Sequence, residues 1–160
     1  ILKKPILKSR LEELLVIIRE KITSDKGYLR LFFTEDWKPI TFRDSPPSIR
    51  EANYKLDHVS FGHDYETAFL LLEASFILNI KNDYETLRIA KIMVDHALEN
   101  GWDNEEGGFF EEGYYFRSDD KCTIIKDSKN WWAQAEALNI FLIMSKIFPH
   151  SSSSFFCSEH

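Results

Sequence analysis

The sequence predicts an all-α protein that forms part of an α/α toroid, a double ring in which inner and outer helices alternate. Two observations support this fold class: four segments show apolar residues at helical spacing, and these segments alternate between amphipathic and almost wholly apolar. Inner helices of a double ring contact neighbours on all sides, whereas outer helices keep one face in water. A simple bundle would instead make all of its helices alike.

Residues 5–22 and 83–99 are expected to form the two outer helices. Pro5 suits the first turn of a helix, and after it leucine and isoleucine recur on one face while charged side chains cover the other. Asp83 can cap the second outer helix, and Gly101 follows the end of that helix. Both helices therefore have one face for the core and one for solvent.

Residues 64–78 and 130–147 are expected to form the two inner helices. The first opens after Gly62 with acidic residues in its first turn, which suits the positive end of the helix dipole. Both segments are apolar on almost every side, so we expect neighbouring elements to cover most of their surface.

The connections are predicted to contain short strands and turns. Residues 28–33 alternate weakly, residues 102–110 enter a second strand through a glycine turn, and residues 45–47 (Ser-Pro-Pro) mark a loop. Helical patterning is lost near the C-terminus. We therefore expect residues 1–148 to be the partial toroid, and residues 149–160 to be a disordered tail foreign to it.

Composition excludes several classes of protein. The formal charge is −6 and the sequence has no basic run, so the electrostatic signature of a nucleic-acid-binding protein is missing. The apolar runs are too short to span a bilayer, and Cys122 and Cys157 show no metal-ligand spacing. We expect a cytoplasmic protein with no nucleic-acid or membrane partner. Because the chain begins with Ile1 and not with Met, we also expect it to start inside a longer polypeptide.

The first candidate site lies where the first inner helix begins. His63 and Glu66 are three residues apart and share a helix face. The positive end of the helix disfavours an imidazolium, so His63 would be a neutral imidazole able to act as a general base, and Glu66 would orient the ring. We expect Asp64, which lies between them, to bind the substrate. On this segment alone, a capping or core histidine is the stronger interpretation.

The second candidate site begins the other inner helix. Trp131 and Trp132 offer a flat apolar surface, and Gln134 and Glu136 add hydrogen-bonding groups. Sugars bind to this combination, because their C–H faces stack on indole while their hydroxyls bond to amides and carboxylates. Filling of the core by the two tryptophans is an equally good interpretation of this segment alone.

The positions of these two segments favour a functional interpretation of both. The N-termini of two inner helices open on the same rim of a toroid, so their polar and aromatic side chains converge at one mouth. Phe33 and Trp37 lie in a loop that can line this mouth. A metal site made by His58 and His63 is a weak alternative, because the helix begins between them and leaves their geometry undefined. His96 lies among exposed positions of an outer helix and is expected to be solvated.

Four blocks of the sequence resemble the N-acylglucosamine/cellobiose 2-epimerase family. GHDYETAFLLLEAS (residues 62–75) is similar to the GHD-x-E-x-x-x-LLLEA segment of that family. DNEEGGFFEEGYY (103–115) and KNWWAQAEAL (129–138) resemble its next two blocks, in the same order and spacing. LRLFFTEDWKPI (29–40) looks more like the cellobiose 2-epimerase branch. The resemblance covers residues 6–148, and four blocks in register are highly specific.

The resemblance implies an (α/α)6 barrel and an isomerase that inverts C2 of a reducing-end sugar such as cellobiose. In this family the open-chain sugar loses its C2 proton to one histidine, forms an enediolate, and regains a proton on the opposite face from a second histidine. His63 matches one of these histidines, Glu66 matches its carboxylate neighbour, and Trp131 and Trp132 match the aromatic pair beside the sugar. No metal or organic cofactor is implied.

The chain departs from the family's pattern at the second catalytic histidine. That histidine lies in a later segment of the family, and neither His150 nor His160 stands in a matching motif. We therefore expect the chain to be inactive alone. We also expect the uncovered faces of its inner helices to favour self-association.

Other functions stay open at this point. The resemblance also admits an N-acylglucosamine 2-epimerase or an aldose–ketose isomerase, because a shared enediolate can be reprotonated at C1 or at C2. A non-catalytic carbohydrate-binding remnant would keep the tryptophans without the chemistry. A glycoside hydrolase on a similar toroid would need two carboxylates across the cleft, whereas here the motif carries a histidine.

Overall fold

The computed structural model describes residues 4–116 and 121–149 and is mainly helical. Its helices are α1 (Pro5–Ile17) with the π-helix η1 (Ile18–Ile22), α2 (Pro47–Asn53) with the 3-10 helix η2 (Tyr54–Leu56), α3 (Phe61–Leu78), α4 (Tyr84–Gly101) and α5 (Trp131–Ile147). Its strands are β1 (Val59–Ser60), β2 (Glu112–Tyr114) and β3 (Thr123–Lys126). From position 150 onward, the tail predicted over residues 149–160 lies outside the described residues.

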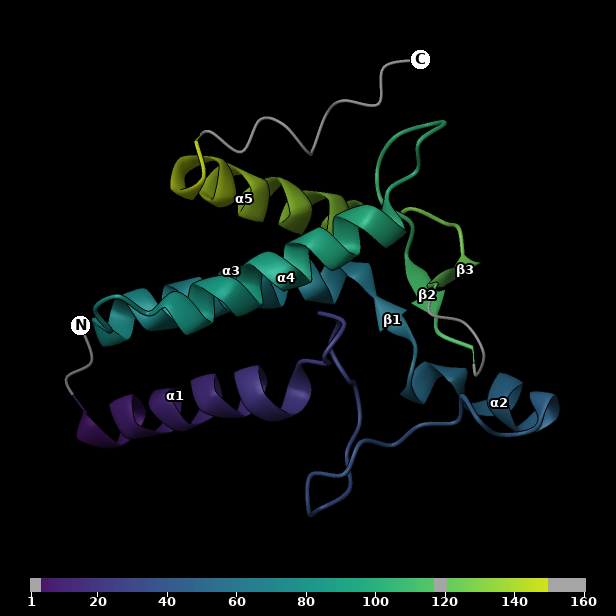
Figure 1. Cartoon of the computed structure of the whole chain (residues 1–160), viewed down its shortest axis with the longest axis horizontal. Helices are drawn as coiled ribbons and strands as arrows, with labels where there is room; N and C mark the ends of the chain where they lie inside the picture. Colours follow the sequence, from purple (N-terminus) through teal and green to yellow (C-terminus); the bar gives the residue numbers. More distant parts are fainter. Residues whose placement is uncertain (1–3, 117–120, 150–160) are drawn as a thin grey trace.

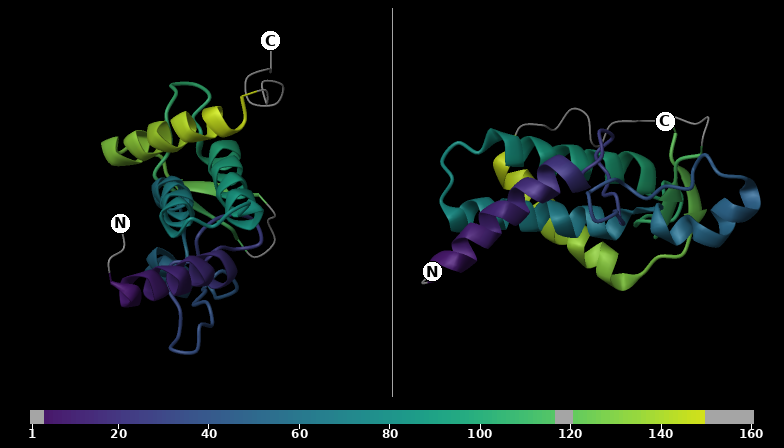
Figure 2. Two further views of the ribbon diagram at one scale, coloured as in Figure 1. Left: turned by 90° about the vertical axis from the view of Figure 1, so that its left-hand side faces the viewer. Right: turned by 90° about the horizontal axis from the view of Figure 1, so that it is seen from below.

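Helix α3 is the central element of the molecule. It packs against α4 and α5 and also contacts α1. Figure 1 shows α3 and α4 side by side, with α1 below them and α5 above. The two turned views of Figure 2 show the same layers from the side and from below. The apolar helix α3 is therefore enclosed on several sides by other helices, as the predicted alternation requires.

All four predicted helices are present, and their ends agree with the predicted ones to within one turn. The first prediction, over residues 5–22, corresponds to α1 continued by η1. Helix α3 begins at Phe61 and not at residue 64, so that His63 lies inside its first turn. The helix ends at Leu78, and the next residue, Asn79, has a φ of 56°, the left-handed conformation common after a helix C-terminus.

The strands predicted at residues 28–33 and 102–110 are wrong. These segments contain only isolated bridges, which pair Thr23 with Leu29, Phe33 with Pro39, and Trp102 with Phe109. Each bridge closes a turn, as at residues 34–38, and the regular pairing does not continue beyond it.

Short β segments were expected in the loops, and the structure has them as an antiparallel sheet, ordered β1-β2-β3, at positions other than the predicted ones. Gly113 lies at its centre and pairs with Val59 on one side and with Ile124 on the other. These strands are only two to four residues long, which is too short for an alternating pattern to be recognised. Pro47, predicted in a loop, is the first residue of α2. Because β1 leads directly into α3, the sheet fixes the point where α3 begins.

Apolar side chains of α3 and α4 form the core. Tyr65 and Leu71 of α3 and Met93 of α4 are almost completely buried. The expectation that neighbours cover α3 and α5 on most sides is correct only in part, because each helix keeps an open apolar face. The large apolar residues exposed on these two helices include Leu70, Phe76, Ile77, Leu138 and Leu142. Self-association stays a prediction, and these faces are where it would occur.

Membrane insertion is a separate question from these exposed faces. Within residues 4–116 and 121–149, no helix has both the length and the apolar composition that crossing a membrane would require.

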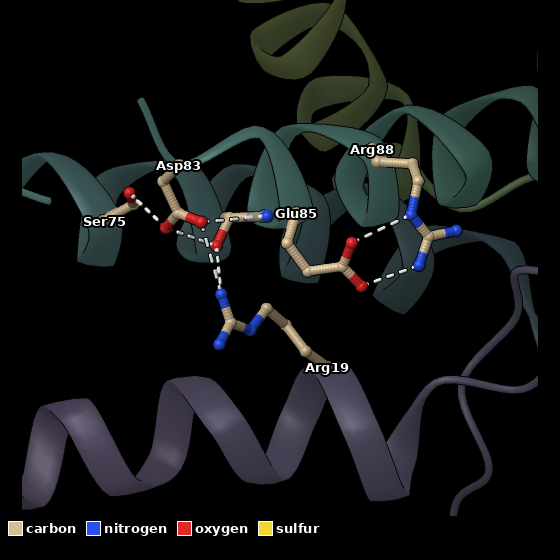
Figure 3. A network of polar contacts seen from close by, with 6 residues as sticks. Arg19, Ser75, Asp83, Glu85 and Arg88 are labelled. Atoms are coloured by element: carbon tan, nitrogen blue, oxygen red, sulfur yellow. Dashed lines mark hydrogen bonds and ion pairs between the residues drawn. The ribbon is translucent and has the colours of Figure 1, made fainter. Parts of the chain in front are cut away.

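Asp83 joins three helices at the start of α4 (Figure 3). As predicted, it caps α4: its carboxylate accepts from the Thr86 backbone N–H at 3.2 Å, and also from the Thr86 hydroxyl at 2.6 Å. The hydroxyl of Ser75 on α3 donates to it at 2.7 Å, and Arg19 of η1 pairs with it at 3.3 Å. Burial alone would raise the pKa of Asp83, but the hydrogen bonds from Thr86 and Ser75 and the charge of Arg19 outweigh burial and lower it.

We expect Asp83→Ala to lower the free energy of unfolding by about 2 kcal/mol, because it removes a helix cap and leaves Arg19 without its carboxylate. Since the pKa of Asp83 is lower in the folded state, its stabilising effect is present above the unfolded pKa, near 3.8. The effect is lost as the pH falls through the folded value. Urea denaturation from about pH 7 to about pH 3 measures both consequences.

Glu85→Ala is the matched control for this prediction. Glu85 pairs with Arg88 on the same helix, but their side chains are 55% and 54% exposed, and such pairs contribute little. We expect this control to lose less than about 0.5 kcal/mol. Equal losses in the two variants, or a loss in Asp83→Ala that does not depend on pH, would contradict the analysis.

Candidate functional site

The N-termini of α3 and α5 lie against each other at Gly62. A Cβ atom at this position would stand 2.6 Å from the Trp132 ring and 2.8 Å from the Cβ of Ala133. Only glycine therefore allows this approach without displacing a neighbour. Asn130 fixes the start of α5, because its side chain accepts a hydrogen bond from the Ala133 backbone N–H at 2.8 Å. The two predicted site segments thus meet in the structure.

His63 is an exposed side chain at this junction. Its ring lies beside the Trp132 indole, with the ring centroids 5.0 Å apart and the planes inclined at 54°. Its Nδ1 atom is 2.7 Å from the hydroxyl oxygen of Ser60, the residue that precedes α3. The imidazole is consequently held on two sides, and Nε2 is the ring nitrogen left for a ligand.

The side chain that contacts the His63 ring nitrogen is that of Ser60, and not that of Glu66 as the sequence predicts. Glu66 is half-buried one turn after His63, and no hydrogen bond joins the two side chains in the described part of the chain. The hydroxyl of Ser60 reaches His63 because Ser60 ends β1 and is itself buried. A serine three residues before a histidine is too common to have indicated this contact from the sequence.

The two tryptophans of α5 differ in exposure. Trp131 is 81% exposed, whereas Trp132 is half-buried against His63. Glu136, four residues after Trp132, is half-buried and lies on the same face of α5. The junction therefore presents one free indole, one indole packed on an imidazole, and a carboxylate one turn away.

Gln134 does not share this surface, because its side chain is used by the protein itself. Its Oε1 accepts from the Phe109 backbone N–H at 2.8 Å, and its Nε2 donates to the Phe109 carbonyl at 2.9 Å. The backbone of Phe109 thus bonds to a side chain in the way that a strand bonds to its neighbour. They attach the loop that contains Phe109 to α5.

The position of Asp64 contradicts the prediction that this residue binds the substrate. It is fully buried, and its Oδ1 accepts from the Leu29 backbone N–H at 2.9 Å. Consecutive helix residues point about 100° apart, so when His63 faces outward Asp64 turns toward the core. A ligand at His63 therefore cannot contact this carboxyl in the described structure.

Phe33 and Trp37 contact each other, with ring centroids 5.4 Å apart. Trp37 is 43% exposed and adopts a positive φ of 62° at the tip of its turn. Figures 1 and 2 place the loop that carries them on the opposite side of α3 from α5. The structure therefore does not bring these two rings to the tryptophans of α5.

The remaining histidines of the described chain are engaged elsewhere. His58 lies 3.9 Å from the carboxylate of Glu112, and both side chains are largely buried. His96 was expected to be solvated, but it is buried and its Nε2 is 2.9 Å from the Tyr115 hydroxyl. The sequence pattern failed here because this residue lies on the side of α4 that faces the loops. Among the described residues, no group of three or more His, Cys, Asp or Glu side chains is arranged to hold a metal ion.

Comparison with known proteins gives one consistent family. The model of the N-acylglucosamine 2-epimerase (GlcNAc 2-epimerase) family matches residues 4–147. The chain is 30% identical over 138 residues to a cellobiose 2-epimerase of Dictyoglomus turgidum, and 26% identical over 133 residues to one of Bacteroides fragilis. These matches cover 85% and 82% of the chain but only 29% of each relative, so the chain spans less than a third of their length.

Solved structures resemble the same part of the fold. A cellobiose 2-epimerase from Spirochaeta thermophila superposes with a TM-score of 0.68 at 26% identity, covering 92% of this chain and 32% of that one. One from Bacillus thermoamylovorans gives a TM-score of 0.69 at 20% identity, with the same coverage. These proteins are (α/α)6 barrels. The predicted fold class, part of an (α/α)6 barrel, is confirmed.

We expect Gly62→Ala to destabilise the chain by about 1–3 kcal/mol, because the added methyl group overlaps the Trp132 ring. Helix propensity alone would favour alanine by about 1 kcal/mol, so the sign of the change tests the close approach. Urea denaturation followed by tryptophan fluorescence gives both the stability and the environment of the indole.

The matched second variant combines Gly62→Ala with Trp132→Phe. The ring atoms nearest the new methyl group belong to the six-membered part of the indole, and a smaller phenyl ring vacates some of this space. We expect Gly62→Ala to lower the free energy of unfolding less in the Trp132→Phe background than in the wild type. A stabilising effect of Gly62→Ala alone would show that the helices are not in contact here.

Proposed function

The chain belongs to the N-acylglucosamine 2-epimerase family, and we propose that in the whole protein it forms the His63 side of a site that inverts C2 of a reducing-end sugar such as cellobiose. The observation that carries this proposal is the exposed imidazole of His63 packed beside Trp132. The cellobiose 2-epimerases among its relatives support the choice of a disaccharide.

The contact with Ser60 suits His63 for the role of a general base. If Nδ1 carries the ring proton and donates it to the Ser60 hydroxyl oxygen, the lone pair of Nε2 is free to accept a proton. Ser60 would hold this tautomer and the ring orientation in the same way that a partner group orients a catalytic histidine in other enzymes. Proton transfer would then require only that C2 of the sugar reaches Nε2.

The reaction needs two proton transfers at C2, one on each face of the sugar, and afterwards His63 releases its proton to solvent while the second acid takes one up. The open-chain sugar has its aldehyde at C1, so the C2–H bond is acidic. When Nε2 takes this proton, the electron pair of the C2–H bond forms a C1–C2 double bond and the carbonyl oxygen gains the charge, which gives an enediolate. Return of a proton to C2 from the opposite face inverts the centre and restores the aldehyde. We assign the first transfer to His63, and the opposite face requires a second acid outside this junction.

The tryptophans and Glu136 would bind the sugar. An indole that is 81% exposed, such as Trp131, can stack on the C–H face of a pyranose. Glu136 adds an acceptor for hydroxyl groups one turn further along α5. We keep Glu66 as a candidate catalytic neighbour of His63, acting on the substrate and not on the ring.

We expect His63→Ala in the whole protein to lower deuterium incorporation at C2 of cellobiose in D₂O by about 100-fold to 10,000-fold, the usual contribution of a general base. Sugar binding, measured by quenching of tryptophan fluorescence, should change only a few-fold because the indoles remain. Ser60→Ala should give a smaller loss of turnover. Glu85→Ala, on an exposed face of α4, is the control and should leave turnover unchanged.

Two outcomes would change this assignment. Full C2 exchange in His63→Ala would remove His63 from the chemistry, whereas sugar binding without exchange in the wild type would favour a non-catalytic carbohydrate-binding protein. Product analysis with cellobiose, mannose and N-acetylmannosamine separates a cellobiose 2-epimerase from an N-acylglucosamine 2-epimerase. A ketose product would instead indicate an aldose–ketose isomerase.

A further inference from the structure

A buried acid and a buried histidine face each other behind the proposed site. Asp64 of α3 is fully buried and His96 of α4 is 6% exposed. Oδ2 of Asp64 and Nδ1 of His96 lie 3.9 Å apart, and neither atom has a hydrogen-bond partner among the described residues. The other atoms of both groups are engaged, Oδ1 with the Leu29 N–H at 2.9 Å and Nε2 with the Tyr115 hydroxyl at 2.9 Å.

The surroundings of this pair favour uncharged forms of both groups. Two ions buried 3.9 Å apart would lose their hydration without a direct bond to replace it. The titratable neighbours are Tyr65 on α3, Lys26 and Tyr28 in the loop before Leu29, Tyr115 and Glu99 beside His96, and Cys122. Lys26 faces His96, and its positive charge disfavours a second positive charge on the imidazole.

The expected proton affinities agree with the geometry. Burial raises the pKa of Asp64 well above its usual value, and the bond from Leu29 opposes this only in part. Burial and the charge of Lys26 lower the pKa of His96 to about 4. Both shifts favour the uncharged form of the group concerned.

We propose that Asp64 is a neutral carboxylic acid whose hydroxyl donates to Nδ1 of His96, and that this acid is a positioning residue which holds the loop at Leu29 against the start of α3. Each group carries one proton: that of Asp64 stays on Oδ2 and is donated to Nδ1, and that of His96 stays on Nε2 and is donated to the Tyr115 oxygen. A displacement of about 1 Å brings Oδ2 and Nδ1 to hydrogen-bonding distance.

The segment held in this way is the one that carries Phe33 and Trp37. Leu29 is bridged to Thr23, and beyond it the chain turns back so that the Ile40 N–H bonds to the Phe32 carbonyl at 2.9 Å. Asp64 follows His63 in the same helical turn. A role of this loop in sugar recognition would rest on the proposed function. The neutral pair of Asp64 and His96 does not rest on it.

Asp64→Asn and Asp64→Ala are the variants that test this proposal. Asparagine has nearly the same shape as a protonated aspartic acid: its oxygen can accept from Leu29 and its NH₂ can donate to His96. We expect Asp64→Asn to have a higher urea midpoint than the wild type at about pH 7, because asparagine stays neutral without having to bind a proton, and to keep the Leu29 amide protected from hydrogen exchange. We expect Asp64→Ala to have a lower midpoint than Asp64→Asn and to exchange this amide more than about 10-fold faster.

The dependence on pH gives a second test with a defined sign. Since the pKa of Asp64 is raised by folding, its contribution to stability is complete below the unfolded pKa and is lost as the pH rises through the folded value. Asparagine cannot ionise, so Asp64→Asn should abolish this loss as the pH rises. The contribution of His96, whose pKa is lowered, is lost as the pH falls from about 6.5 toward about 4 and should remain in both variants.

The wild-type protein alone is sufficient to overturn the proposal. Nitrogen-15 NMR should show the His96 ring as a neutral Nε2–H tautomer at about pH 7. An imidazolium signal for His96 at this pH, or an Asp64→Asn variant as unstable as Asp64→Ala, would mean that Asp64 is an ionised carboxylate. None of these measurements uses a sugar, so failure of the proposed function would leave their outcome unchanged.

Discussion

The close contact between the first turns of α3 and α5 is the constraint on which the candidate site depends. Gly62 lies against the Trp132 ring and Ala133, with no room for a Cβ atom. This contact sets the separation of the two helices at the end where the polar and aromatic residues stand. A larger residue at position 62 would separate the helices, and His63 would no longer pack on Trp132.

The rest of the fold holds α3 in the place that this contact requires. Strand β1 determines where α3 begins, and Asp83 attaches its other end to α4 and η1 through Ser75 and Arg19. Asp64 attaches the loop at Leu29 near the first turn. The helix that carries the candidate base is therefore fixed at both ends. Between its ends, it packs against α4 and α5. Preorganisation of this kind lets a catalytic group keep its orientation without a rearrangement when substrate arrives.

The sequence predicts the helices well because long segments repeat their apolar spacing several times. It fails where the structure depends on single contacts between distant residues. The strands are too short to show a period, and the segments predicted as strands are turns whose backbone is held by Asp64 and Gln134. Buried His96 looks exposed in a helical pattern because Tyr28 and Tyr115, which lie in the connections between helices, help to cover its ring. Ser60 could not be found from the sequence, because its contact with His63 depends on where β1 ends and α3 begins.

Under the proposed function, the geometry of His63 also restricts where the rest of the site lies. Ser60 occupies Nδ1 and Trp132 lies against the ring, so a proton can be exchanged with a substrate only through Nε2 and from one direction. Inversion at a carbon centre needs a proton donor on the other face of the sugar. Neither His58 nor His96 can supply it, because both are largely buried and directed at other partners. A sugar bound here would therefore have one face toward α3 and α5 and the other toward residues outside this junction.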